Sequence, residues 1–130
     1  MSKRSIIAAF TMAAAIGSTL LFASPASAAN VFRCPGAGSD PGSKCTKVIG
    51  IDPGSSLTVR NGPGTNYPRA TGPWSSFPNG ATVELMCWST GTPVYSYDIW
   101  VRLDIPAAQQ HWVSDYYLDT GYVQNVLPHC

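Results

Sequence analysis

The chain has 130 residues, a formal net charge of +1 and only 12% charged residues. Its eight lysines and arginines are scattered, which argues against binding to nucleic acid or to an anionic membrane surface. Twelve glycines and eleven prolines recur every few residues, and 11% of the chain is aromatic. This composition is typical of an all-β protein with many turns and argues against a disordered chain.

Residues 1–28 are predicted to form a signal peptide. Lys3 and Arg4 precede an uncharged apolar run over 6–22, and small residues occupy 26–28, where a signal peptidase cuts. We expect cleavage after Ala28 and secretion of a single domain of about 100 residues, which has no further contact with the membrane. The alternative is an uncleaved membrane anchor, which the shortness of the apolar run disfavours.

The four cysteines of the chain are Cys34, Cys45, Cys87 and Cys130. In a small secreted domain they predict two disulfides, for which three pairings are possible. We favour Cys34–Cys45, because these residues bracket a loop of glycine, serine and proline, and this choice leaves Cys87 to bond Cys130. A metal site with His111 and His129 is the alternative, but it lacks paired-ligand spacing. We therefore expect no metal and no other cofactor.

The first half of the secreted chain is predicted to be an arm followed by the opening strand of a barrel. Residues 29–53 are expected to be an arm and loop, in which 48–51 form an edge strand, and residues 54–130 are expected to be the barrel domain. Residues 57–60 alternate apolar and polar side chains, as in a strand with one buried face. Residues 61–64, Asn-Gly-Pro-Gly, contain two overlapping turn signals, one for positive φ and one for a type II turn. A loop with Tyr67 follows.

The middle of the chain is predicted to contain an irregular stretch and then the clearest strand. Trp74 and Phe77 lie in the stretch over 65–80, and we expect them to fold back and cap the end of the barrel, because large apolar side chains are usually buried. In the strand over 81–88, Val83, Leu85 and Cys87 share the face that we assign to the core. A turn is expected at 89–91.

The last part of the chain is predicted to contain three short strands. Residues 99–103 alternate, so that Val101 and Leu103 suit the core while Trp100 and Arg102 point to the opposite face. Residues 111–113 are expected to form a short strand with His111 at its surface end. A turn is expected at 114–115, and 116–118 is expected to be either a tight helical turn or the end of a strand. A final strand over 122–127 completes the expected order.

Three segments resemble the bacterial SH3-like (SH3b) domain family. They are Leu-Thr-Val-Arg-Asn-Gly-Pro-Gly-Thr at 57–65, Gly-Ala-Thr-Val-Glu-Leu at 80–85, and Trp-Val-Arg-Leu at 100–103 followed by Trp-Val-Ser-Asp-Tyr-Tyr-Leu at 112–118. The resemblance covers about 54–121 and implies a small, strongly bent five-stranded barrel. The chain departs from the family at His111, which replaces the usual glycine, and in the longer segments 72–79 and 104–110.

The resemblance also implies a ligand groove. It places Trp100 at the groove tryptophan, Tyr117 at the groove tyrosine and Tyr67 in the loop that forms the other wall. Arg102, on the same strand face as Trp100, would contact a carboxylate of an extended peptide. The alternative for each aromatic residue is ordinary packing. Relatives hold cell-wall peptides or cross-bridges near a hydrolase, while eukaryotic cousins bind proline-rich helices.

These patterns favour a secreted, non-catalytic, monomeric module that binds a cell-wall (peptidoglycan) peptide. A second hypothesis is an extracellular protein-interaction role, such as inhibition of a hydrolase through the disulfide-closed loop 34–45. A third is a weak cell-wall hydrolase. Catalysis is disfavoured, because two disulfides leave no thiolate. A carboxylate pair would need Glu84, which is expected to point outward from its strand, and aspartates that are expected at turns.

Overall fold

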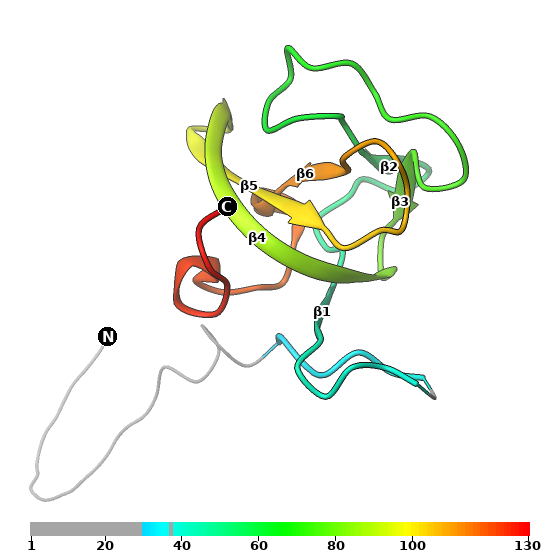
Figure 1. Cartoon of the computed structure of the whole chain (residues 1–130). Helices are drawn as coiled ribbons and strands as arrows, with labels where there is room; N and C mark the ends of the chain where they lie inside the picture. The colour runs from blue at the N-terminus through cyan, green and yellow to red at the C-terminus, as the bar shows by residue number, and fades with distance from the viewer. Residues whose placement is uncertain (1–29, 37) are drawn as a thin grey trace, which may run out of the picture.

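The computed structural model describes residues 30–36 and 38–130, so the expected signal peptide, residues 1–28, lies outside the described residues. Six antiparallel strands are arranged as a four-stranded sheet, in the order β1-β4-β5-β6, and a two-stranded sheet, β2-β3 (Figure 1). The strands are β1 (Lys44–Lys47), β2 (Ser56–Thr58), β3 (Ser76–Pro78), β4 (Thr82–Val94), β5 (Tyr97–Leu103) and β6 (Trp112–Ser114). Two 3₁₀ turns follow, η3 (Asp115–Tyr117) and η4 (Val123–Asn125).

The all-β prediction is confirmed, but the described residues form two sheets and not one closed five-stranded barrel. An isolated bridge between Arg60, which follows β2, and Trp112 of β6 links the two sheets in place of a continuous ladder. A second bridge, between Val48 and Leu118, joins the segments that follow β1 and η3. Strands β2, β3 and β6 have three residues each, and prolines between β2 and β3 remove backbone donors that a longer ladder needs. Among the described residues, no helix has the length and apolar character needed to span a membrane.

The core lies between the sheets and is filled by aliphatic side chains from both. Val83, Leu85 and Cys87 of β4 are buried, as the alternation in the sequence predicts. Val101 and Leu103 of β5 are buried as well. The period-two pattern therefore gave the correct inner face of both long strands.

Strand β4 runs well past the turn expected at 89–91. It continues to Val94 through two irregularities of register, and the chain reverses at Tyr95 and Ser96, whose φ angles are 49° and 67°. Positive φ at both central residues is what a tight two-residue hairpin requires.

Gly91, which was expected in a turn, lies within β4 and packs against another segment: a Cβ on it would lie 1.9 Å from the carbonyl oxygen of Pro63. Glycine is therefore needed there for close approach of two backbones.

The segment 61–64 reverses the chain, but not with the predicted turn types. Neither Gly62 nor Gly64 has a positive φ; instead, the amide of Gly64 donates to the carbonyl of Gly62 at 2.9 Å. A Cβ on Gly62 would lie 2.3 Å from Cδ1 of Tyr67. The tyrosine ring thus lies directly over this glycine, so contact with the ring and not a left-handed backbone requires glycine here.

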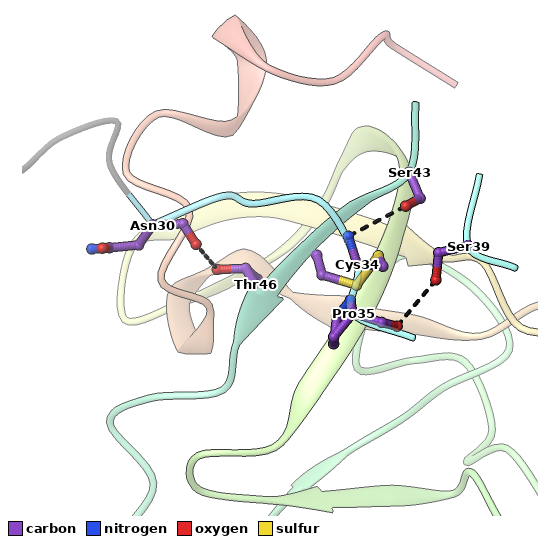
Figure 2. The surroundings of a disulfide bond; sticks show 7 residues. Asn30, Cys34, Pro35, Ser39, Ser43 and Thr46 are labelled. Atoms are coloured by element: carbon purple, nitrogen blue, oxygen red, sulfur yellow. Dashed lines mark hydrogen bonds between the residues drawn. A yellow bond between two sulfur atoms is a disulfide. The ribbon is translucent and has the colours of Figure 1, made fainter. Parts of the chain in front are cut away.

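Both predicted disulfides are present, Cys34–Cys45 and Cys87–Cys130, each with Cα atoms 5.0 Å apart. The first joins the arm to β1 (Figure 2). Phe32 and Cys45 exchange two backbone hydrogen bonds, of 2.9 and 2.7 Å, and Thr46 Oγ1 donates to the carbonyl of Asn30 at 3.0 Å. Two disulfides point to an oxidising, extracellular environment.

Two expected strands at the edges of the fold are placed differently. The first edge strand is β1 at 44–47 and not 48–51; Val48 is fully buried and pairs with Leu118 only through an isolated bridge. The last strand, expected over 122–127, is replaced by η4, in which the amide of Leu127 donates to the carbonyl of Val123 at 3.0 Å. Both side chains are buried, so their spacing of four residues follows a helical turn.

Candidate functional site

A groove of about 480 Å³ lies between the two sheets. Leu57 of β2 and Trp100 of β5 line it from the protein interior. Three tyrosines line it from the β4–β5 hairpin and from η3, and residues 50–52 and 55–58 line it from the start of the other sheet. The groove is therefore made where the two sheets and η3 meet.

Tyr95, Tyr116 and Tyr117 form a continuous group along the groove, which we call the tyrosine ladder. The ring centroids of Tyr95 and Tyr116 are 5.1 Å apart with an interplanar angle of 40°, and those of Tyr116 and Tyr117 are 5.1 Å apart at 85°. Tyr95 is 77% exposed and Tyr116 45% exposed, so much of their surface is open to a ligand. Paired aromatic rings of this kind stabilise one another's positions.

A buried hydrogen-bond network fixes η3, which carries two members of the ladder. Asp115 is 3% exposed, and its carboxylate accepts from Tyr97 Oη at 2.8 Å and from Thr120 Oγ1 at 2.6 Å. Burial raises the pKa of Asp115 to about 6, although both hydrogen bonds act in the opposite direction. Ser114 Oγ caps the turn by accepting from the amide of Tyr116 at 3.2 Å. The ladder is thus positioned by polar contacts beneath it.

Trp100 lies at the groove but is only 3% exposed, so its predicted exposure is wrong. Its Nε1 donates to the carbonyl of Thr92 at 2.8 Å, and a Cβ on Gly91 would lie 2.9 Å from its Cδ1. Ile99, Trp100 and Val101 are consecutive and all buried, so both faces of β5 are covered at this point. The Trp100 side chain therefore forms the floor of the groove, and its N–H group is already bonded to the carbonyl of Thr92.

Tyr117 is the second predicted residue that the structure places at the groove. It is partly buried, and burial raises its pKa, with smaller contributions from Tyr95, Tyr116 and Asp52. Its carbonyl accepts from the amide of Ile49 at 2.9 Å. Trp100 and Tyr117, which the family resemblance singled out, are thus brought to the same groove.

The other two predicted site residues do not line the groove. Tyr67 packs over Gly62, and Arg102 lies in β5 opposite Cys87 and Trp112. The cation at the groove is Arg60, whose Nη1 donates to the carbonyl of Tyr67 at 2.9 Å. The sequence reasoning missed four residues at the groove, Asp52, Arg60, Tyr95 and Tyr116. The alternation over 57–60 was a signal for Arg60 alone, since it turns Arg60 away from Leu57 and Val59.

A second cavity, of about 170 Å³, is lined by Trp74 and Phe77. Phe77 is partly buried in β3, whereas Trp74 is 38% exposed. Trp74 packs edge-on against His111, with ring centroids 6.4 Å apart. His111 was expected at the surface, but it is 1% exposed, because Trp74 packs against its ring. Its carbonyl accepts from the amide of Leu103 at 2.8 Å. Its Nδ1 lies 3.1 Å from the carbonyl oxygen of Gln109.

The described residues contain no free cysteine and no group of histidine, cysteine and acidic side chains arranged to hold a metal ion. Asp115, the one carboxyl group with a strongly raised pKa, is enclosed by its two hydrogen-bond donors and does not line the groove. The groove therefore offers aromatic faces, hydroxyl groups and two charged side chains.

The chain matches no protein-family model, no curated protein and no solved structure.

Proposed function

We propose that this chain is a secreted, non-catalytic binding module of the bacterial SH3-like (SH3b) type, and that its groove holds an extended cell-wall peptide. The observation that carries the proposal is the exposed tyrosine ladder along a groove of about 480 Å³. Cavities of this size hold small ligands and short peptide segments.

The chemistry of the groove suits a peptide with small side chains. Tyrosine rings offer a flat apolar face to aliphatic groups, and each hydroxyl offers a hydrogen bond to an amide. Since Trp100 Nε1 is already bonded to Thr92, polar contacts with the ligand come from the tyrosine, serine and threonine hydroxyls at the groove. An extended backbone presents N–H and C=O groups at regular intervals to such a surface.

Secretion is supported by two independent features. The positively charged and then apolar segment over 1–28 has the order of a signal peptide. The two disulfides suit an oxidising compartment, where small domains use such bonds for stability. Wall-associated peptide is a ligand that a secreted bacterial module would meet.

Cosedimentation of the disulfide-bonded protein with purified peptidoglycan tests the proposal. Tyr116→Ala removes the middle ring of the ladder, and we expect it to weaken binding about fivefold to tenfold, as for an aromatic contact residue. Tyr122→Ala is the matched control, because Tyr122 is 59% exposed but does not line the groove. Absence of binding by the unmodified protein, or equal loss in both variants, would contradict the proposal.

The alternative, an inhibitor of an extracellular hydrolase, is favoured by the loop between Cys34 and Cys45. Besides the disulfide, Arg33 Nη2 donates to the carbonyl of Ser39 at 3.0 Å, and Ser39 Oγ donates to the carbonyl of Pro35 at 3.0 Å. These two bonds hold Arg33, Pro35 and Ser39 in place, and residues that are already ordered lose little entropy on binding. Exchange of residues 38–42 for a glycine-serine segment of equal length would abolish inhibition but leave peptidoglycan binding unchanged.

A further inference from the structure

The charges at the groove are few and opposite in sign. Among the residues that line it, Asp52 and Arg60 are the only ones with a charged side chain at neutral pH. Both belong to the same stretch of chain, which runs along one wall of the groove. Their positions along that wall therefore favour one direction of binding for a ligand with a positive and a negative end.

Asp52 marks the end of the groove beside the tyrosine ladder. A Cβ on Gly50 would lie 3.9 Å from Cδ1 of Tyr117, and the charge of Asp52 contributes to the raised pKa of Tyr117. The carbonyl of Asp52 accepts from the amide of Ser55 at 3.0 Å, which closes a turn immediately before β2. A carboxylate next to phenol rings favours a cationic group, through charge attraction and cation–π contact.

Arg60 also lines the groove, at the end of the extended stretch that begins after the turn at Asp52. Its backbone exchanges hydrogen bonds of 2.9 and 2.8 Å with Trp112, and its Nη1 donates to the carbonyl of Tyr67, so both backbone and side chain are held. A guanidinium has five N–H donors, and the bond to Tyr67 uses one of them. A held guanidinium is well suited to a carboxylate.

Between the two charged residues the chain first turns at 52–55 and is then extended over 55–60, and this extended part gives the length of the wall. Residues 55–60 run through β2 and onward to the bridge at Arg60. At about 3.3 Å per residue this stretch spans about 16 Å, which is also the length of about five residues of an extended peptide.

We infer that the groove selects a linear peptide of about five residues, with its free amino group at Asp52 and its free carboxylate at Arg60. The inference rests on the proposed peptide-binding function and adds to it a length and a direction.

Penta-alanine is a suitable probe, in four forms: unblocked, N-acetylated, C-amidated and blocked at both ends. Chemical-shift titration of the protein gives the affinity for each form and for unblocked tri-alanine. Each blocked end is expected to weaken binding about threefold, since exposed ion pairs contribute modestly. Tri-alanine, which is too short to reach both charges, is expected to bind no better than the doubly blocked pentapeptide.

Protein variants then assign each end. In Asp52→Asn, N-acetylation no longer weakens binding, while C-amidation still does; Arg60→Gln gives the opposite result. Arg60→Lys keeps the charge and retains the effect of C-amidation, which separates the charge from the structural bond to Tyr67. Asp98→Asn and Lys47→Gln are matched controls, because both residues are exposed and outside the groove.

The outcomes separate the two levels of the proposal. If penta-alanine and cell-wall peptide both fail to bind the unmodified protein, the peptide-binding function and the inference fail together. If all four forms bind equally, or if Asp52→Asn changes the response to C-amidation and not to N-acetylation, the peptide-binding function stands and the inferred direction is wrong.

Discussion

The floor of the groove and its tyrosine ladder contain aromatic residues with opposite roles. Trp100 is buried, hydrogen-bonded through its only side-chain donor and enclosed by the backbone at Gly91. Tyr95 and Tyr116 are exposed on a hairpin turn and on η3. The comparison shows that the aromatic residue within strand β5 supports the fold, while aromatic residues outside the strands present the surface available to a ligand.

Gly91→Ala is the strongest test of the floor. Its Cβ would lie 1.9 Å from the carbonyl oxygen of Pro63, a backbone atom that has no rotamer with which to move away. We expect a loss of about 4 kcal/mol in the free energy of unfolding, measured by urea denaturation. Gly42→Ala is the control, since a Cβ there meets only a side-chain atom at 3.6 Å; equal losses in both variants would contradict the packing explanation.

The support beneath the ladder can be tested by pH. Burial raises the pKa of Asp115 from 3.8 to about 6 in the folded state, so the folded protein binds more protons than the unfolded chain in this interval. The stability contributed at this site is therefore fully present below about pH 4 and is lost as the pH rises through about 6. The difference is about 3 kcal/mol, at about 1.36 kcal/mol for each pH unit.

Denaturation of the unmodified protein and of Asp115→Asn between pH 4 and 7 measures this contribution as the difference between the two pH profiles. Asp98→Asn, which changes an exposed carboxylate, should leave the profile unchanged. If the stability of the unmodified protein minus that of Asp115→Asn rises with pH instead of falling, the two hydrogen bonds affect the pKa of Asp115 more than burial does.

Trp100→Phe sharpens the distinction between floor and ladder. It removes the hydrogen bond to Thr92 and leaves a small void, so we expect a loss of about 2 kcal/mol in the free energy of unfolding. Because the ladder is held separately, peptide affinity should change less than about threefold. A large loss of affinity with unchanged stability would instead make Trp100 a contact residue.

Tyr95→Ala should have the smallest effect on stability. The side chain is 77% exposed, and surface substitutions usually change the free energy of unfolding by less than about 0.5 kcal/mol. Binding of penta-alanine should still weaken about fivefold, because the variant removes the outermost ring of the ladder. Unchanged binding would restrict the ligand surface to Tyr116 and Tyr117.

Period-two alternation and cysteine spacing predicted much of the fold. They identified the inner faces of β4 and β5 and both disulfides. They failed at the hairpin, because Ser-Thr-Gly at 89–91 is a stronger turn signal than Tyr95-Ser96, although the latter residues adopt positive φ. At Gly91 the glycine signal reflected close packing between distant segments, which local sequence cannot distinguish from a turn.

The site was less predictable, for a related reason. Alternation places Trp100 and Arg102 on the outer face of β5, but it does not show whether another segment covers that face. Strand β5 lies between β4 and β6 in the sheet. Trp100 is covered by Gly91 and Thr92, which belong to the hairpin end of β4. Arg60 reaches the groove through its pairing with Trp112, a contact between residues far apart in the sequence.

The way in which Cys34 and Cys45 are joined has a consequence for proteolysis. Most of the described residues between them are exposed, and the disulfide joins the two ends of this segment to each other. Next to the disulfide, the backbone of Phe32 pairs with that of Cys45. A protease that cuts the loop once would add the mass of one water molecule, yet the two pieces would stay joined and the groove would keep its shape. Only after reduction would the short N-terminal piece separate, so cleavage would be visible on a reducing gel and invisible on a non-reducing one.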